Sequence, residues 1–426
     1  MAEVGTALTG GIVEAVERIL DHVEAVEPEI LALLPEPGRR ERLVAEARAL
    51  ELRYPSPAAR PPLFGALVGV KDLFSARGFE TRAGSRLPAS LFAMYEASSL
   101  TALKKAGALV LGKTVSTEFA YFAPGPTRNP LDHARTPGGS SSGSAAAVAA
   151  GFCHLALGTQ TIGSISRPAA YCGIAGYKPS YGLVRADGVV PFSPSLDHVG
   201  LLARDVATLA TGAAALVSGL APNVGRGSPT FARLALAVPE GPYLSQAETV
   251  AREAFELTLA RLEGFGCRIT RVRVFPDIDE INERHRRIAA AELAIVHRVW
   301  FADYRELYAR ETSELIEKGK RIGPETLTED LGGRAALRAR LDAALAEAGA
   351  CAWISPSAMG PAPRGLGATG SPLMNLPWTH AGVPTLAIPS GELADAMPLG
   401  IQLATPFGTD AALFAVGREI EGYLTR

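Results

Sequence analysis

The sequence predicts an α/β protein in which helices are layered on a β-sheet. Short apolar runs typical of buried strands alternate with longer helical segments and with glycine- and proline-rich loops. The run at 67–71 is one such strand, and a helical stretch at 98–106 and a second apolar run at 108–113 follow it. Hydrophobic residues make up 47% of the 426 residues, which suits the large core that a layered fold needs.

Apolar spacing and turn composition predict the other elements. Two N-terminal helices are expected at 11–26 and 39–51, and the order of elements within 234–274 indicates a βαβ unit. A charged run at 283–287 is expected to lie on a solvated helix face. The remaining expected elements are a proline-rich break at 54–62, a loop at 122–143, helices at 144–150 and 247–262, a mostly helical region at 276–348, and strands at 154–158, 234–238, 267–274, 352–354 and 385–388.

We expect one domain, because large α/β enzymes often form a single body at this length. Its expected parts are the N-terminal helices (1–60), a core that carries the motifs described below (63–220), the βαβ unit with its helical region (230–350), and a C-terminal return to the core (351–426).

Composition narrows the function classes. A formal net charge of −2 argues against a dedicated nucleic-acid binder, and no apolar stretch is long enough to suggest a membrane span. The four cysteines are scattered and are expected to be reduced and mostly buried, and the histidine spacing predicts no metal site. No cofactor is expected, and a cytoplasmic location follows because no secretory signal is recognisable.

Two glycine- and serine-rich turns, at 138–144 and 158–168, carry the most information. Such runs are commonest as linkers or helix caps, but linkers do not usually lead straight into apolar helices and strands, as both of these do. A phosphate-binding loop would require a lysine after the glycines, and a nucleophile elbow would require a Gly-x-Ser-x-Gly pattern around Ser164; neither is present.

A serine nucleophile beside exposed backbone N–H groups fits the second turn better. Gly163 allows close approach of a substrate, and the N–H groups of Thr161, Ile162, Gly163 and Ser164 are candidates for an oxyanion hole. A serine also needs a base, and Lys71 closes an apolar strand where desolvation would lower its pKa. Taken alone, Lys71 would be interpreted as an ordinary strand-end lysine.

Together these segments resemble the amidase signature family. The resemblance rests on the segments at 69–72, 136–151, 158–168 and 172–180, and it continues at 192–200, 369–372, 375, 377–379 and 398–402. It implies a mixed central β-sheet sandwiched between α-helices. It also implies a triad of Lys71, Ser140 and Ser164, in which Ser140 follows a cis peptide bond and relays protons.

The implied reaction is hydrolysis of a carboxamide. Neutral Lys71 takes a proton from Ser140, Ser140 takes one from Ser164, and Ser164 attacks the carbonyl carbon to form an acyl-enzyme that water then cleaves.

The chain departs from many family members at 160 and 166, where Gln160 and Ser166 replace an ion-paired aspartate and arginine. This pattern resembles the malonamidase-like branch, in which the arginine before proline contacts a substrate carboxylate. Arg167 holds that position, and Gly139 and Gln160 are expected to contribute to substrate binding beside it. The alternative is a structural Arg167 that hydrogen-bonds loop carbonyls.

Ile162 stands where the family usually has glycine. Its β-branched side chain would either narrow the acyl pocket toward small substrates or spoil the oxyanion hole.

The favoured function is therefore an amidase acting on a small linear carboxamide, which could carry a carboxylate. The expected partner is a small molecule, with neither nucleic acid nor membrane, and the family resemblance suggests a homodimer. Two alternatives stay open: the glutaminase subunit of an aminoacyl-tRNA amidotransferase, and a catalytically weak binding protein on the same scaffold.

Overall fold

The computed structural model describes residues 11–221 and 234–425. One mixed sheet runs through the molecule in the order β2-β1-β3-β5-β4-β9-β10-β8-β6-β7. β1 pairs in parallel with β2 and β3, β6 pairs in parallel with β7 and β8, and the central strands pair antiparallel. The strands are β1 (Leu67–Lys71), β2 (Leu109–Thr114), β3 (Leu155–Gln160), β4 (Ala175–Lys178), β5 (His198–Ala203), β6 (Ala235–Glu240), β7 (Arg268–Arg273), β8 (Ala352–Pro356), β9 (Thr385–Ala394) and β10 (Met397–Ala404).

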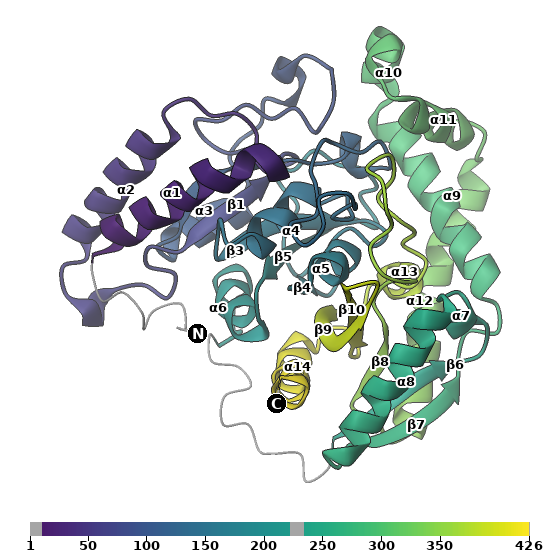
Figure 1. Cartoon of the computed structure of the whole chain (residues 1–426). Helices are drawn as coiled ribbons and strands as arrows, with labels where there is room; N and C mark the ends of the chain where they lie inside the picture. The colour runs from purple at the N-terminus through teal and green to yellow at the C-terminus, as the bar shows by residue number, and fades with distance from the viewer. Residues whose placement is uncertain (1–10, 222–233, 426) are drawn as a thin grey trace.

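Helices cover both faces of this sheet (Figure 1), so the predicted fold class, a mixed sheet sandwiched between helices, is confirmed. They are α1 (Ile12–Ile30), α2 (Arg39–Arg53), α3 (Ser98–Lys105), α4 (Ser142–Ala149), α5 (Ser166–Cys172), α6 (Val206–Leu216), α7 (Pro242–Ser245), α8 (Thr249–Gly264), α9 (Ile278–Val296), α10 (Arg298–Tyr304), α11 (Arg310–Gly319), α12 (Pro324–Glu347), α13 (Leu376–Ala381) and α14 (Asp410–Leu424).

Alternating side chains of the strands divide the core between the two faces. Val68 and Val70 of β1 face a cluster that contains residues of α3, α6 and α14. Leu67 of the same strand faces a cluster with residues of α1, α2, α4 and α5. This follows from the two-residue period of a strand. β3 is likewise buried on both faces, up to its last residue, after which the second glycine- and serine-rich turn continues.

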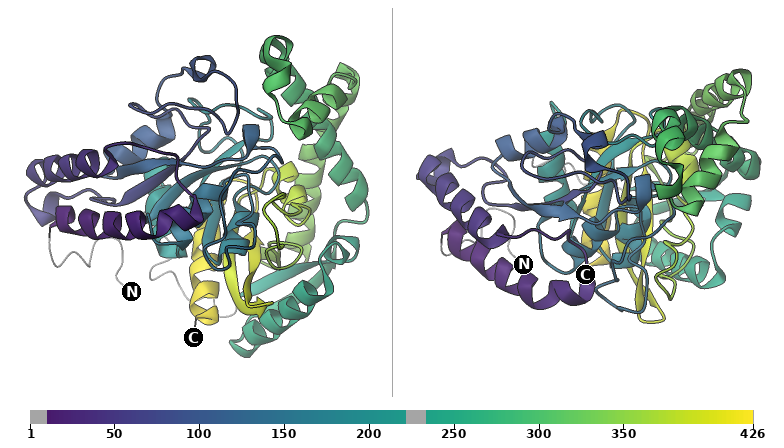
Figure 2. Two further views of the ribbon diagram at one scale, coloured as in Figure 1. Left: turned by 45° about the horizontal axis from the view of Figure 1, so that its top comes forward. Right: turned by 90° about the horizontal axis from the view of Figure 1, so that it is seen from above.

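The far end of the sheet carries a separate layer. α9 packs against α11, α12 and α13 on one side of the molecule, whereas α1 and α2 lie on the opposite side (Figure 2). α9 contacts α13, and α13 lies next to the second glycine- and serine-rich turn through Thr379. The helical region at 276–348 thus reaches the turn that carries Ser164.

The structure corrects several expected elements. The helix predicted at 144–150 begins earlier, at Ser142, and α1 continues past Pro28 to Ile30. Three strands, β4, β5 and β10, had no counterpart in the prediction, nor did α5, α6, α13 and α14. The solvated face expected at 283–287 is only partly right, because Arg286 is exposed but His285 is completely buried.

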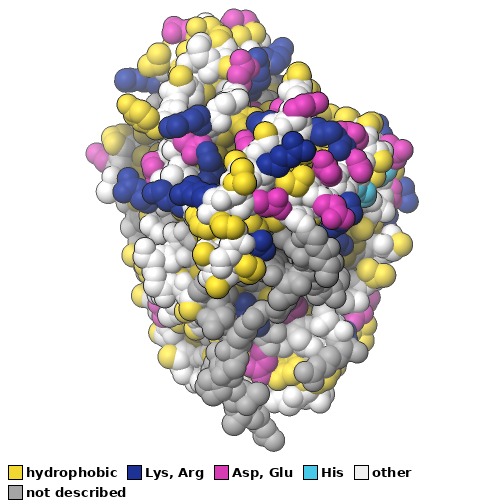
Figure 3. Space-filling view, turned by 90° about the vertical axis from the view of Figure 1, so that its left-hand side faces the viewer, with side chains coloured by type: hydrophobic (Ala, Val, Ile, Leu, Met, Phe, Trp, Pro, Cys, Tyr) yellow, Lys and Arg dark blue, Asp and Glu magenta, His cyan; other side chains and the backbone are white. Residues whose placement is uncertain are grey.

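Charges of both signs are interspersed on the face drawn in Figure 3. On α1 and α2, which lie on that side, Arg40 pairs with Asp21 at 2.7 Å and with Glu24 at 2.8 Å. The described helices include none that is both long and apolar enough to cross a bilayer.

All four cysteines are free, as expected; three are buried and Cys351 is partly exposed.

Candidate active site

The carboxyl ends of β1 and β3 form the floor of the site. Lys71 ends β1, Thr159 lies near the end of β3, and the two strands are parallel neighbours. The Lys71 Nζ lies 2.7 Å from Ser140 Oγ and 2.7 Å from Thr159 Oγ1, and the Lys71 side chain is fully buried. The structure therefore brings together two of the three predicted triad residues and adds Thr159.

Burial sets the charge of this lysine. Desolvation lowers the pKa of Lys71 well below its ordinary value, and the negative charge of Asp197 opposes that shift only in part. Lys113, a second buried lysine, forms an ion pair with Asp72 at 2.9 Å. Lys71 has no such partner among the described residues. Lys178 is also buried, and burial lowers its pKa to about 7, but its Nζ donates to the carbonyls of Pro179 and Val383. Lys71 is the buried lysine that lies beside Ser140.

Ser140 belongs to a loop that leads into α4. The Gly139–Ser140 peptide bond is cis, as the family resemblance implies. The Ser141 and Ser142 hydroxyls donate to the carbonyls of Thr159 (3.3 Å) and Gly138 (2.8 Å), so both side chains support the loop.

Ser164 sits in the turn between β3 and α5, and 6% of its surface is exposed. The Gln160 side chain stabilises this turn by hydrogen bonds. Its Oε1 accepts from the N–H groups of Ile165 (2.8 Å) and Ser166 (2.9 Å). Its Nε2 donates to Thr379 Oγ1 at 3.0 Å. Because the Gln160 amide is buried and engaged with protein groups, the geometry gives it a supporting role in the turn, in place of the substrate contact expected for it.

The relay is half formed in this structure. Lys71 and Ser140 are hydrogen-bonded, but Ser164 Oγ makes no hydrogen bond to any described residue. Catalytic hydrogen bonds are often long without substrate and tighten when it binds. The Ser140–Ser164 link therefore stays a prediction.

Backbone donors beside Ser164 are available. Within the described part of the chain, the N–H groups of Ile162, Gly163 and Ser164 have no hydrogen-bond partner. A Cβ on Gly163 would overlap Asn375 Oδ1 and lie 2.9 Å from Pro372 Cβ, so this position requires glycine. These donors occupy the segment in which the sequence predicts an oxyanion hole.

Arg167 is buried, with 2% of its surface exposed. Its Nη2 donates to Gly139 O at 2.6 Å and to Thr369 Oγ1 at 3.1 Å, while Nε and Nη1 have no partner. Burial lowers the pKa of Arg167 to about 10. The Gly139 carbonyl is thus already occupied by Arg167. One nitrogen thus holds the loop, as expected for a structural arginine. The two nitrogens without partners are compatible with the other expected role, contact with a substrate carboxylate.

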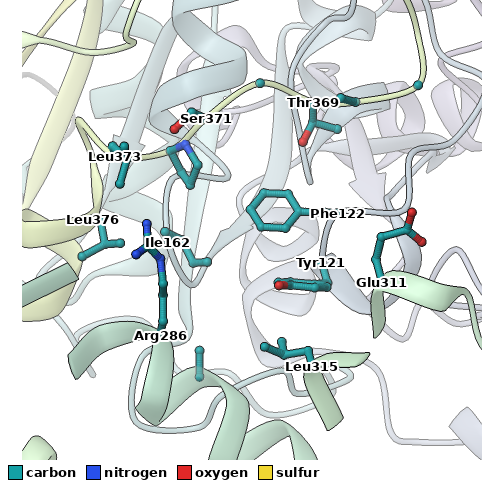
Figure 4. A pocket seen from close by; sticks show the side chains of 15 residues that line it. Tyr121, Phe122, Ile162, Arg286, Glu311, Leu315, Thr369, Ser371, Leu373 and Leu376 are labelled. Carbon is teal, nitrogen blue, oxygen red and sulfur yellow. The ribbon is translucent and has the colours of Figure 1, made fainter. Parts of the chain in front are cut away.

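A cavity of about 480 Å³ opens beside the turn (Figure 4). Ile162 lines it, with Arg286 and Glu311 contributed by α9 and α11. Its other walls are Tyr121, Phe122, Ala289, Leu315, Leu376 and the loop at 367–373. The Ile162 side chain therefore contributes a wall to the cavity, while both of its expected effects, on the acyl pocket and on the oxyanion hole, stay predictions.

Reasoning from sequence gave no individual site role to Thr159, Asp197, His285 or Thr379, although all of these except His285 lie in segments that carry the family resemblance. Thr159 could have been found, because the ends of parallel neighbouring strands meet at one edge. Asp197 accepts a hydrogen bond from Thr161 Oγ1 at 2.5 Å, and burial raises its pKa to about 6. No sequence signal marks His285, because it contacts the turn from a distant helix. Thr379 lies in the segment 377–379 that carries the family resemblance, but only the structure shows its contact with the turn. Among the described residues, no group of three or more His, Cys, Asp or Glu side chains is placed to hold a metal ion.

Comparisons with known proteins identify the family of this chain. The family model described as Amidase matches residues 14–414. A glutamyl-tRNA(Gln) amidotransferase subunit from Geobacter sp. (strain M21) is 30% identical over 97% of this chain and 95% of its own length. The corresponding amidotransferase subunit from Oleidesulfovibrio alaskensis is 43% identical over 48% of this chain. That match spans only 43% of the relative's length, so in this alignment the chain covers less than half of the relative.

Solved structures show the same fold. A structure titled "Crystal structure of amidase" has a TM-score of 0.86 and 31% identity, covering 97% of this chain and 96% of that one. The native peptide amidase of Stenotrophomonas maltophilia has a TM-score of 0.81 and 25% identity, covering 98% and 94%. These relatives do not distinguish the malonamidase-like branch, which remains a prediction. The chain belongs to the amidase family.

Proposed function

We propose that this protein hydrolyses a carboxamide through an acyl-enzyme on Ser164. The observation that carries the proposal is a fully buried Lys71, unpaired with any described carboxylate, whose Nζ lies 2.7 Å from Ser140 Oγ. A lysine in that state accepts a proton, and the serine beside it can pass one on.

The reaction has two halves. Ser164 Oγ attacks the amide carbonyl carbon while its proton passes through Ser140 to Lys71, and the N–H groups at 162–164 stabilise the oxyanion. The proton then returns to the leaving nitrogen, which departs as ammonia or an amine. Water deprotonated through the same pair cleaves the ester, which releases the carboxylate product and Ser164.

The substrate class follows from Arg167 and the cavity. Two unpartnered guanidinium nitrogens at a buried position favour a substrate with a carboxylate, since a guanidinium binds that group with two parallel hydrogen bonds. This preference is the one expected from the malonamidase-like branch. The apolar walls of the cavity accept the body of such a substrate beside Ile162.

Replacement of Ser164 tests the function. Ser164→Ala should abolish hydrolysis of every amide in a panel and also labelling by a fluorophosphonate, because the nucleophile is gone. Ser166→Ala is the matched control: its buried hydroxyl lies two residues away and has no hydrogen-bond partner, so activity should persist. Hydrolysis that survives in Ser164→Ala would refute the proposal.

A second candidate is the glutaminase subunit of a tRNA-dependent amidotransferase. It is favoured by the full-length similarity to a protein of that name at 30% identity. In that case the chain would act with partner subunits on glutamine. Stable co-purification with such subunits and glutamine hydrolysis stimulated by charged tRNA would support it, whereas full amide turnover by the isolated chain would favour the first proposal.

A further inference from the structure

The turn before Ser164 is held from behind by two side chains outside the glycine- and serine-rich segments. His285 Nε2, on α9, lies 3.0 Å from the carbonyl oxygen of Thr161. Thr379 Oγ1, on α13, lies 2.7 Å from the carbonyl oxygen of Ile162. Two consecutive peptide carbonyls of the predicted oxyanion hole are therefore fixed by side chains.

Because the peptide unit is planar, these contacts also orient the N–H groups that follow the two carbonyls. In a trans peptide the C=O and the following N–H point in opposite directions. A side chain that holds the Thr161 carbonyl therefore turns the Ile162 N–H the other way, and one that holds the Ile162 carbonyl does the same for Gly163. Both N–H groups are unpaired within the described chain, and the Ile162 side chain lines the cavity.

We infer that His285 and Thr379 are positioning residues that orient the Ile162 and Gly163 N–H groups toward the carbonyl oxygen of the substrate. The inference rests on the proposed hydrolysis at Ser164 and goes beyond it, because it makes the oxyanion hole depend on helices α9 and α13.

The surroundings of His285 suit this role. The Thr161 carbonyl can only accept, so the neutral ring carries its proton on Nε2, and Nδ1 has no partner. Burial lowers the pKa of His285 to about 3, and the positive charge of Arg334 adds to the effect. The ring of His380 packs edge-on against His285 at 5.6 Å. The ring is therefore neutral at neutral pH, and its Nε2–H is in place as a donor.

Thr379 has a comparable setting. It accepts a hydrogen bond from Gln160 Nε2 at 3.0 Å, and of its two contacts with carbonyl oxygens the one to Ile162 is the shorter, 2.7 Å against 3.1 Å to Asn375. Gln160 thus braces the same hydroxyl that holds the oxyanion turn.

Two matched pairs of variants test the inference. His285→Met removes the donor at similar volume, whereas His285→Gln can return an N–H near the Nε2 position. Thr379→Val removes the hydroxyl, whereas Thr379→Ser keeps it. We expect the Met and Val variants to lose about 10- to 100-fold in kcat with little change in KM, since loss of a single oxyanion donor typically costs about 10²–10³-fold.

The rate of Ser164 labelling by a fluorophosphonate and the affinity of a boronic acid should fall by similar factors, because both form tetrahedral adducts. His285→Gln and Thr379→Ser should keep most activity, and all four should unfold near the wild-type temperature.

Equal loss in His285→Met and His285→Gln, or a loss confined to KM, would overturn the inference. So would lost kcat with unchanged boronate affinity. Failure of the proposed function would look different: wild type itself would show no amide hydrolysis that depends on Ser164.

Discussion

Arg167 is the residue whose environment says most about the substrate. Its guanidinium is buried beside the nucleophile turn, holds the Gly139 carbonyl with one nitrogen, and leaves Nε and Nη1 unpartnered. A buried donor without a partner is costly, so a bound carboxylate would satisfy it. The sequence identified this position, but only the structure shows that its side chain holds the Gly139 carbonyl and Thr369 while two of its nitrogens lack a partner.

Arg167→Lys should separate the two roles. It retains the charge but loses paired recognition of a carboxylate, so kcat/KM for acidic amides should fall about 10-fold or more relative to neutral amides. Arg286→Ala is the control, because this exposed arginine lines the cavity beside Ile162. Arg167 is not among the residues that line that cavity; it is buried behind Thr369, with which it shares a hydrogen bond. Equal losses on acidic and neutral amides in Arg167→Lys would assign the arginine to the loop alone.

The triad positions are readable from sequence because each lies in a long motif. Their protonation states cannot be predicted from sequence in the same way, because the protonation state of Lys71 depends on which carboxylates the fold brings near it. Asp72 is its neighbour in sequence, yet Asp72 pairs with Lys113, and the carboxylate whose charge opposes the lowering of the Lys71 pKa is that of Asp197. Gln160 shows the same limit: its amide faces the turn, and no spacing rule indicates that.

Helices and strands with a regular apolar pattern could be predicted from the sequence, whereas those whose conformation depends on packing against other elements could not. α1 and α8 follow helical spacing, and β1 and β6 are continuous apolar runs. β4 is only four residues long, and α5 and α13 are short helices buried against the sheet, where packing decides the conformation. These weakly marked elements flank the candidate site.

The contact between α9 and α11 gives a prediction at this scale. A Cβ on Gly319, the last residue of α11, would overlap the Ala290 carbonyl and lie 2.9 Å from Ala294 Cβ. Gly319→Ala should therefore lower the free energy of unfolding by about 1–3 kcal/mol through overpacking. Gly332, inside α12, has open space where a Cβ would lie. Gly332→Ala should therefore raise the free energy of unfolding by about 0.5–1 kcal/mol.

Thermal or denaturant unfolding of the two alanine variants provides the comparison. Destabilisation by both, or by neither, would contradict the close approach of α9 and α11. Since α9 carries His285, Gly319→Ala is also expected to slow Ser164 labelling.

At the scale of the molecule, one sheet joins the two halves of the site. β1 and β3 supply Lys71 and the start of the Ser164 turn. α9 and α13, from the second half of the chain, fix that turn through hydrogen bonds from His285 and Thr379. The family resemblance predicted the sandwich, and the structure confirms it. Sequence could not show how far the helical region at 276–348 reaches, because that depends on contacts between residues more than a hundred positions apart.

The pH dependence of Ser164 labelling by a fluorophosphonate, located by peptide mass, tests the central claim most directly. The pKa of Lys71 is lowered by burial, so the neutral base forms as pH rises through that lowered value. The labelling rate should climb over that range, well below the ordinary titration of a lysine. In Lys71→Arg, whose guanidinium stays protonated, the climb should vanish and the rate fall by about 10²–10⁴-fold. Labelling of another residue, or an unchanged profile in Lys71→Arg, would contradict the account.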